Sequence, residues 1–355
     1  MAIRELRMDR ETYGVSGRTN VPADASSRPG FLVIGGRQPS GRRKPDWQLF
    51  DRAVIVHADP ATGVVRNVMQ YTSAPEVMPE ETGAGTIFKA GTRIGDRLYT
   101  CTSTEVLVYA LPSFEIVEYF THPYFNDLHH VALGPCGELV VVSTGLDLVL
   151  VFSPQRELIG QYNVADEPTW SRFSAEIDYR KVPTTKPHKA HPNFAFHLEG
   201  DLWVTRFYQK DAIRAACPTD RFAIEVGFPH DGVVNFGNVY FTTVNGYVCV
   251  FDQHSRKLEQ NYDLYRMSST AKALGWCRAI EPIAPELVVV GFTRLRVTKF
   301  RENVWWVKER LGAGKLLSEA TRICCYDLRR RELVWETSLE QYGVNAIFAI
   351  HRAAD

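Results

Sequence analysis

The stretch HHVALGPCGELVVVSTGLDLVLVFSPQRELIGQYNV, residues 129–164, decides the fold. It contains four short runs rich in β-branched residues, and turn residues such as Gly-Pro and Ser-Pro separate them, which is the pattern of successive strands. The last run is more polar, as a strand at an outer edge would be. The stretch therefore predicts one four-stranded antiparallel sheet, the unit from which a propeller blade is built.

Four further stretches follow the same four-strand plan, which is typical of a repeat protein. They cover residues 85–122, 191–228, 230–264 and 278–339. The two chain ends complete a sixth unit, because the N-terminal part supplies three strands and residues 344–352 supply one. Closing a ring in this way removes exposed sheet edges. We therefore predict an all-β, six-bladed β-propeller in which a C-terminal strand joins the N-terminal blade. The alternative is a β-sandwich with a second domain.

The composition is that of an ordinary globular protein. Of the 355 residues 45% are hydrophobic, and 41 Lys and Arg balance 41 Asp and Glu, so charge predicts neither nucleic-acid nor membrane binding. The first residues lack the apolar core of a secretory signal, and no run approaches the about 18 apolar residues of a membrane helix. We expect a cytoplasmic protein with an N-terminal tail at 1–30 and a single propeller domain at 31–355.

Long insertions indicate which rim of the propeller carries the function. The turns on one rim are short, whereas the segments 36–51, 165–190 and 293–320 all fall on the other rim. Residues 302–317 have partial helical periodicity and are predicted to form a short helical lid. Because binding residues collect on loops held by a rigid scaffold, we expect the functional face at this rim.

Three histidines begin the innermost strands of three successive repeats: His130, His191 and His230. Counting back from the turn glycine of each repeat places His130 and His230 at one level, with Asn193 rather than His191 at that level in the middle repeat. Three imidazoles with an open coordination position suit catalytic Zn²⁺, and also Fe, Mn, Ni or Cu. We therefore predict a divalent transition metal, zinc before the others, bound by the three histidines. The alternative is that they cap the channel through hydrogen bonds.

Neighbouring side chains complete this predicted site. Asp127, His129, Asp231 or Glu81 would complete or orient the ligand shell. Successive side chains of a strand point to opposite faces, so His129 is expected to face the sheet if His130 faces the channel.

Arginine and aromatic residues predict the kind of substrate. The guanidinium fork suits carboxylate, phosphate or sulfate, and Arg278 is expected at the channel mouth to grip such a group. The predicted catalytic residues are His188, Arg278 and Tyr179. The predicted substrate-binding residues are Arg206, Tyr208, Arg294, Arg296, Trp276, Asn193 and Asn345.

Cys277 has two interpretations. It lies beside Arg278 at a channel entrance, where a lowered thiol pKa would make a nucleophile with His230 or His191 as its base. The other interpretation is a buried, unreactive thiol.

With these strands and residues placed, the architecture resembles six-bladed propellers of the NHL and SMP-30/gluconolactonase type over about residues 31–352. The resemblance implies a divalent metal in the central channel and lactonase, phosphotriesterase or lyase activity. The histidine set is similar to the three-histidine zinc centre of the peptidylglycine amidating lyases. SMP-30-like enzymes use Glu, Asn and Asp ligands, which here would be Glu81, Asn193 or Asn345, and Asp231.

These features together predict a metal-dependent hydrolase or lyase that acts on a small anionic organic substrate in the central channel. The metal would polarise a carbonyl or activate water. The alternative function is a non-catalytic propeller scaffold that binds a protein partner. No nucleic acid or membrane is expected as a partner, and the oligomeric state is left open.

Overall fold

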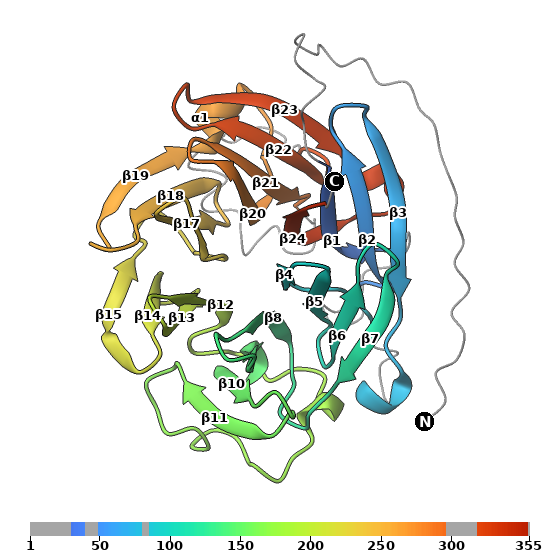
Figure 1. Ribbon diagram of the computed structural model, residues 1–355, viewed down its shortest axis with the longest axis vertical. Helices are drawn as coiled ribbons and strands as arrows, with labels where there is room; N and C mark the ends of the chain where they lie inside the picture. Colours follow the sequence, from blue (N-terminus) through green and yellow to red (C-terminus); the bar gives the residue numbers. More distant parts are fainter. Residues whose placement is uncertain (1–29, 40–48, 80–84, 296–317, 354–355) are drawn as a thin grey trace.

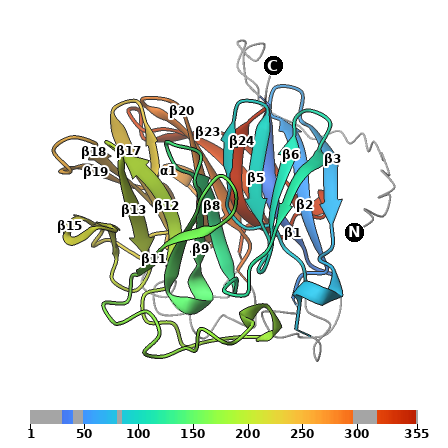
Figure 2. The ribbon, with the colours of Figure 1, turned by 60° about the horizontal axis from the view of Figure 1, so that its bottom comes forward.

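Six four-stranded antiparallel sheets surround a central axis in the computed structural model (Figure 1). The structure describes residues 30–39, 49–79, 85–295 and 318–353. The predicted all-β, six-bladed propeller is therefore confirmed. The short turns lie on one rim, and the segment between the third and fourth blades runs across the other rim (Figure 2).

Each blade runs outward from an innermost strand near the axis to an outermost strand at the edge. The first blade contains β24 (Ala346–Arg352), β1 (Phe31–Arg37), β2 (Arg52–Asp59) and β3 (Val64–Tyr71). The second contains β4 (Thr92–Ile94), β5 (Arg97–Cys101), β6 (Val106–Ala110) and β7 (Glu115–Phe120). The third contains β8 (Leu128–Leu133), β9 (Leu139–Ser143), β10 (Leu148–Phe152) and β11 (Leu158–Asn163).

The other three blades follow the same order. The fourth contains β12 (Pro192–Leu198), β13 (Asp201–Arg206), β14 (Asp211–Arg214) and β15 (Cys217–Ala223). The fifth contains β16 (Val233–Asn235), β17 (Asn238–Thr243), β18 (Tyr247–Asp252) and β19 (Leu258–Asp263). The sixth contains β20 (Trp276–Ala284), β21 (Leu287–Thr293), β22 (Arg322–Asp327) and β23 (Glu332–Ser338).

Helical structure in the described residues is short. One α-helix, α1 (Leu264–Ser268), follows β19, and Asp263 caps its first turn. The 3₁₀ turns are η3 (Pro75–Val77), η4 (Thr144–Leu146), η5 (Tyr179–Lys181) and η7 (Glu340–Tyr342). The predicted lid at 302–317 lies outside the described residues. Within the described part of the chain, no helix is both long and apolar enough to span a membrane.

Burial along each blade follows the side-chain pattern of its strands. The middle strands β9 and β10 are buried almost throughout, because other blades cover both faces of the sheet. The outermost strands β7 and β23 alternate between exposed and partly buried residues, since only one of their faces meets a neighbouring blade. This confirms the prediction that the polar last run of each repeat forms the edge.

The chain closes through β24, which pairs antiparallel with β1. Ile347 and Ile350 of β24 share one buried cluster with Val289 and Ile323 of the sixth blade and Phe31 of β1. The closing strand therefore completes the first blade and also packs against the last one. This confirms the closure predicted from the two chain ends.

Four innermost strands each carry, in their half nearest the insertion rim, one residue that has no partner in the ladder. These bulged residues are His129 in β8, Asn193 in β12, Ala279 in β20 and Phe348 in β24. The strand β20 has a second such residue, Ile283, nearer its other end. A bulge bends the strand and re-aims the side chain, so alternation changes phase at that point. Gly35 lies opposite the bulge of β24, where a Cβ would come within 1.8 Å of the Ala346 carbonyl oxygen. Only glycine fits there.

Substituting Ile347 tests how much closure contributes to stability. Ile347 is fully buried, so Ile347→Ala should lower the free energy of unfolding by about 2–5 kcal/mol, measured by urea denaturation. The control is Ile159→Ala on β11, a residue that is 59% exposed, which should cost less than about 0.5 kcal/mol. Equal losses in the two variants would contradict the closing role of β24.

Candidate functional site

A cavity of about 820 Å³ opens at the rim that carries the insertions. Each of the six blades contributes at least one polar or aromatic residue from its innermost segment to the lining. These residues include, in blade order from the first, Phe348, Lys89, His129, Asn193, His230 and Arg278. The six-fold arrangement therefore brings together side chains from positions 89 to 348 of the chain.

The Phe348 side chain lies close to four of the other five residues, Lys89, Arg278, His129 and His230. Its ring centroid lies 4.8 Å from the Lys89 Nζ and 4.6 Å from the Arg278 guanidinium carbon. The imidazoles of His129 and His230 lie 6.2 and 6.0 Å from the same ring. The negative face of an aromatic ring attracts cations, so the bulge of the closing strand holds both positive groups near the axis.

Asn193 determines which nitrogen of His129 carries a proton. The Asn193 side chain donates from Nδ2 to the Pro229 carbonyl oxygen at 3.0 Å, which can only accept. The amide oxygen Oδ1 therefore faces His129 Nδ1, 2.8 Å away, and Nδ1 must donate. Burial and the nearby Lys89 ammonium lower the pKa of His129 to about 3. The ring is therefore neutral near pH 7, with a lone pair at Nε2.

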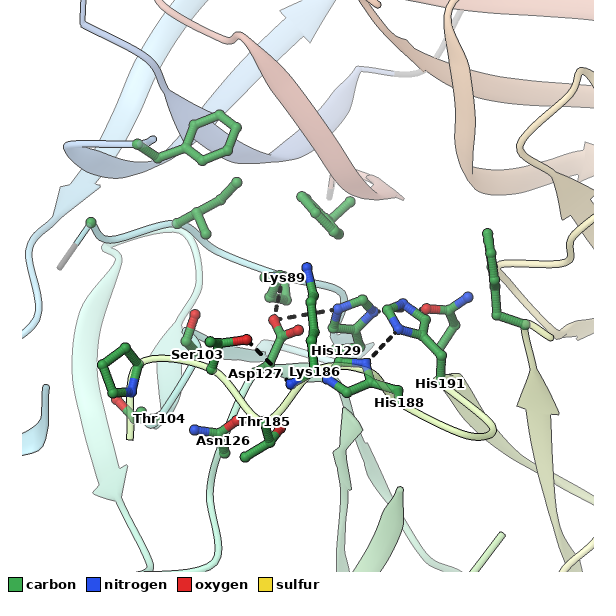
Figure 3. Close-up of a pocket in the computed structure, with 18 of the residues that line it drawn as sticks. Lys89, Ser103, Thr104, Asn126, Asp127, His129, Thr185, Lys186, His188 and His191 are labelled. Atoms are coloured by element: carbon green, nitrogen blue, oxygen red, sulfur yellow. Dashed lines mark hydrogen bonds and ion pairs between the residues drawn. The ribbon is translucent and has the colours of Figure 1, made fainter. Parts of the chain in front are cut away.

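An ion pair lies beside His129. The Lys89 Nζ is 3.1 Å from Asp127 Oδ1, and His129 Nε2 is 3.5 Å from the same oxygen. Burial opposes ionisation of this carboxyl group, yet the Lys89 ammonium holds the pKa of Asp127 well below its usual range. Figure 3 shows these three side chains converging on one side of the cavity. The pair places a carboxylate and an ammonium next to a neutral imidazole.

His188 and His191 form a hydrogen-bonded pair in the same cavity (Figure 3). Their Nδ1 atoms are 2.8 Å apart, so one Nδ1 must donate and the other must accept. Burial lowers the pKa of both imidazoles, that of His191 well below its usual range. Each neutral ring carries one proton. The ring that donates from Nδ1 therefore has a lone pair on Nε2, whereas the ring that accepts at Nδ1 carries its proton on Nε2. The pair thus offers one Nε2 lone pair and one Nε2–H.

Asp147 holds the loop that carries this pair. Its carboxylate accepts hydrogen bonds from three successive backbone amides, at 2.8 Å from Lys189, 3.0 Å from Ala190 and 2.7 Å from His191. Asp147 is fully buried, and Arg172 forms an ion pair with it. His191 has a left-handed backbone with φ of 53°, a conformation that these bonds stabilise. The pair is thus positioned by the third blade as well as by the insertion.

His230 is the most deeply buried imidazole of the cavity lining, with 1% exposure. Its Nδ1 lies 3.5 Å from Asp231 Oδ1, while Nε2 has no hydrogen-bond partner among the described residues. Burial lowers its pKa, so the ring is neutral. A buried polar atom without a hydrogen-bond partner lowers the stability of the folded protein. A ligand group that hydrogen-bonds to Nε2 would remove this cost and so bind more tightly.

The structure brings together many of the predicted site residues. His188, Arg278 and His191 line the cavity, and Arg294 lines it while forming an ion pair with Glu340. The cavity lining also includes His230, Asn193, Tyr208 and Trp276. The expectation that the insertion rim carries the site is consistent with this geometry.

The structure places His130 elsewhere, and His129 takes the position expected for it. The His130 ring stacks on Phe194 at 3.6 Å, and its Nδ1 accepts a hydrogen bond from the Ala195 amide at 3.2 Å. Two local features shift the register. The turn after β8 leaves five residues between its last paired positions, 133 and 139, where the turn after β12 leaves two, between 198 and 201. The bulge at His129 then inverts the alternation.

Three further predicted residues are structural and do not line the cavity. Tyr179 is buried in η5, and its hydroxyl oxygen accepts from the Ser174 amide at 2.8 Å. Arg206 makes a two-pronged ion pair with Asp211. The Asn345 amide oxygen accepts from the Gln38 amide at 2.8 Å. The remaining predicted residues, Arg296 and Glu81, lie outside the described residues.

Cys277 is a core residue. It is fully buried and packs with Leu274 and Phe292. Burial raises the pKa of its thiol well above the usual value, which disfavours the thiolate that a nucleophile needs. The interpretation of Cys277 as a buried core thiol is confirmed.

The predicted three-histidine metal centre does not fit this geometry. His130 lies outside the cavity, and the Nδ1 atoms of His188 and His191 bond to each other. The Lys89 ammonium already neutralises Asp127. Among the residues that the structure describes, no group of three or more His, Cys, Asp or Glu side chains is arranged to hold a metal ion. We therefore derive no chemical step through a metal.

Comparisons with known proteins show the fold alone. No family model matches the chain, and no curated protein matches it in sequence. A protein of unknown function from Bacteroides caccae superposes with a TM-score of 0.57 at 10% identity, over 91% of this chain and 98% of that chain. A streptogramin B lyase gives a TM-score of 0.41 at 12% identity, over 58% of this chain and 64% of that chain.

A catalytically inactive virginiamycin B lyase from Staphylococcus aureus, solved with quinupristin, gives a TM-score of 0.43 at 11% identity. The match covers 70% of this chain and 69% of that chain. At this level of similarity, neither lyase bears on the function of this chain.

His130 should make the stability of the protein depend on pH. Burial lowers its pKa to about 3, so between pH 6.5 and 3 the unfolded chain binds a proton that the folded chain does not. Stability is therefore complete above pH 6.5 and falls as the pH falls, by up to about 1.4 kcal/mol per pH unit. Urea denaturation at pH 7, 6 and 5 should show a shallower fall for His130→Asn than for wild type. Ile159→Ala, which removes an exposed side chain that does not titrate, should leave the slope unchanged. An unchanged slope in His130→Asn would rule out this origin.

Elemental analysis tests the predicted metal. Protein purified without added metal and without chelator should contain far less than one metal per chain, because the predicted ligands do not converge. Stoichiometric metal in the wild type that disappears in His230→Ala, but stays in His197→Ala near the turn that ends β12, would restore the metal prediction.

Proposed function

We propose that this protein is an enzyme of the lyase or hydrolase type that transfers protons on a small organic anion bound in the central cavity. The observation that carries the proposal is the His188–His191 pair, with its 2.8 Å Nδ1–Nδ1 hydrogen bond. Bond elimination and ester hydrolysis both need a base and an acid at one site. This pair supplies both.

Proton transfer through the pair balances without net charge. The ring whose Nε2 holds a lone pair accepts a proton from the substrate or from water. It passes its Nδ1 proton to the Nδ1 of its partner, and the partner gives its Nε2 proton to the leaving group. Both rings end neutral with their tautomers exchanged. The lowered pKa values of His188 and His191 favour this neutral cycle, because an imidazolium would lack the lone pair.

The charge of the cavity supports an anionic substrate. The described lining residues include one carboxylate, Asp127, and five Lys or Arg side chains: Lys89, Arg180, Lys186, Arg278 and Arg294. Three of these cations form ion pairs, Lys89 with Asp127, Arg180 with Asp178 and Arg294 with Glu340. Positive groups in a cavity of low dielectric constant attract an anion and stabilise negative charge that develops on a substrate oxygen. Arg278, which lies next to Phe348 near the axis, is the candidate for this role.

Substitution of the pair tests the proposal. Wild-type protein would be screened by mass spectrometry against esters and β-substituted carboxylates. His188→Asn and His191→Asn should each lower the rate found by about 10²–10⁴-fold. His197→Asn, on β12 but outside the cavity, should leave it unchanged. Reaction in H₂¹⁸O distinguishes the classes, since only a hydrolase incorporates the label. Full activity in both pair variants would refute the proposal, and no turnover of any candidate would favour a scaffold.

A further inference from the structure

A group of aromatic side chains lines the mouth of the cavity without being buried in the core. Phe207 and Phe228 stack with centroids 4.7 Å apart and planes within 15°. Tyr208 meets Phe207 edge-on at 5.3 Å and is 51% exposed. Trp276 is also partly exposed and lines the same cavity. Clustered aromatic surface that is left open to solvent is typical of a binding site.

This aromatic group is continuous with the His188–His191 pair. The His191 imidazole lies 5.2 Å from Phe207 and 5.8 Å from Tyr208. On its other side it meets the His129 ring at 4.9 Å, and His129 adjoins Asp127. On this side of the cavity the order is therefore Phe207 and Tyr208, the histidine pair, then His129 and Asp127.

Arg278 lies between two aromatic rings of the cavity lining, those of Trp276 and Phe348. The Arg278 guanidinium is 4.8 Å from the Trp276 ring and 4.6 Å from the Phe348 ring. Contact with two rings restrains the long side chain, so less conformational entropy is lost when it binds an anion. Arg278 thus offers a restrained positive group in the same cavity lining as Phe207 and Tyr208.

We propose that the ligand of this cavity is an aryl-bearing organic anion. Its ring packs against Phe207, Tyr208 and Trp276, and its anionic group pairs with Arg278 near the axis. The bond that reacts then lies beside His191, which contacts Phe207 and Tyr208, and its partner His188. This inference rests on the proposed function, because it assigns a substrate class to the same site.

Titration calorimetry with three matched probes tests the substrate class. The probes are cinnamate, the aliphatic carboxylate hexanoate and the neutral cinnamamide. Cinnamate should bind at least about 10-fold more tightly than either of the others, because it alone has both a ring for stacking and a charge for Arg278. Equal binding of cinnamate and hexanoate, or no measurable binding of cinnamate, would overturn the inference.

Two variants separate the two anchors. Tyr208→Leu should weaken cinnamate binding by about 2–10-fold and leave hexanoate unchanged. Arg278→Gln should weaken cinnamate and leave cinnamamide unchanged. Phe236→Leu is the matched control, since Phe236 is an exposed aromatic residue in the turn between β16 and β17, outside the cavity lining. A uniform loss for all probes in either variant would contradict its assigned contact.

His188→Asn separates this inference from the proposed function. If cinnamate binds to this variant as to wild type while turnover is lost, both proposals stand. If turnover persists in the variant, the role of the histidine pair fails, while aryl-anion binding is judged by the probes alone. If turnover depends on His188 but the probes show no preference for cinnamate, the substrate class fails and the enzyme assignment remains.

Discussion

The pairing of β24 with β1 is the interaction on which the rest of the structure depends. A propeller blade without its innermost strand leaves a gap at the axis, and this strand comes from the opposite end of the chain. The same strand carries Phe348, whose ring meets Lys89, Arg278, His129 and His230 from four other blades. The same strand therefore closes the fold and completes the cavity lining.

The cavity is a polar centre in a protein whose blades are joined by apolar packing. Hydrogen bonds orient its polar groups: His129 donates to Asn193, and Asn193 donates to the Pro229 carbonyl oxygen. Burial keeps the imidazoles neutral. Neutral imidazoles suit proton transfer near pH 7, but they also make the folded state less stable in acid. The groups that suit the proposed chemistry thus limit acid stability.

The insertion between β11 and β12 supplies the histidine pair, which lies outside the blade strands. Its last residues carry His188 and His191, and Asp147 of the third blade holds their backbone by three amide hydrogen bonds. Asp147 is fully buried, and Arg172 forms an ion pair with the same carboxylate. The loop is therefore fixed to the rigid scaffold at the point where the histidine pair begins.

The sequence by itself determined the blades, their number, the closing strand and the rim that carries the long insertions, because strand periodicity, turn residues and insertion lengths are local properties of the chain. It also determined that histidines and arginines gather at that rim. Which histidine faces the channel was decided only by tertiary structure, since a bulge and a longer turn at β8 depend on strand pairing. Lys89 and Phe348 were missed because each sits in a run that reads as core, although a lone lysine within TIFKAG was a usable signal. Both residues line the cavity only because six blades bring their innermost segments together at one axis.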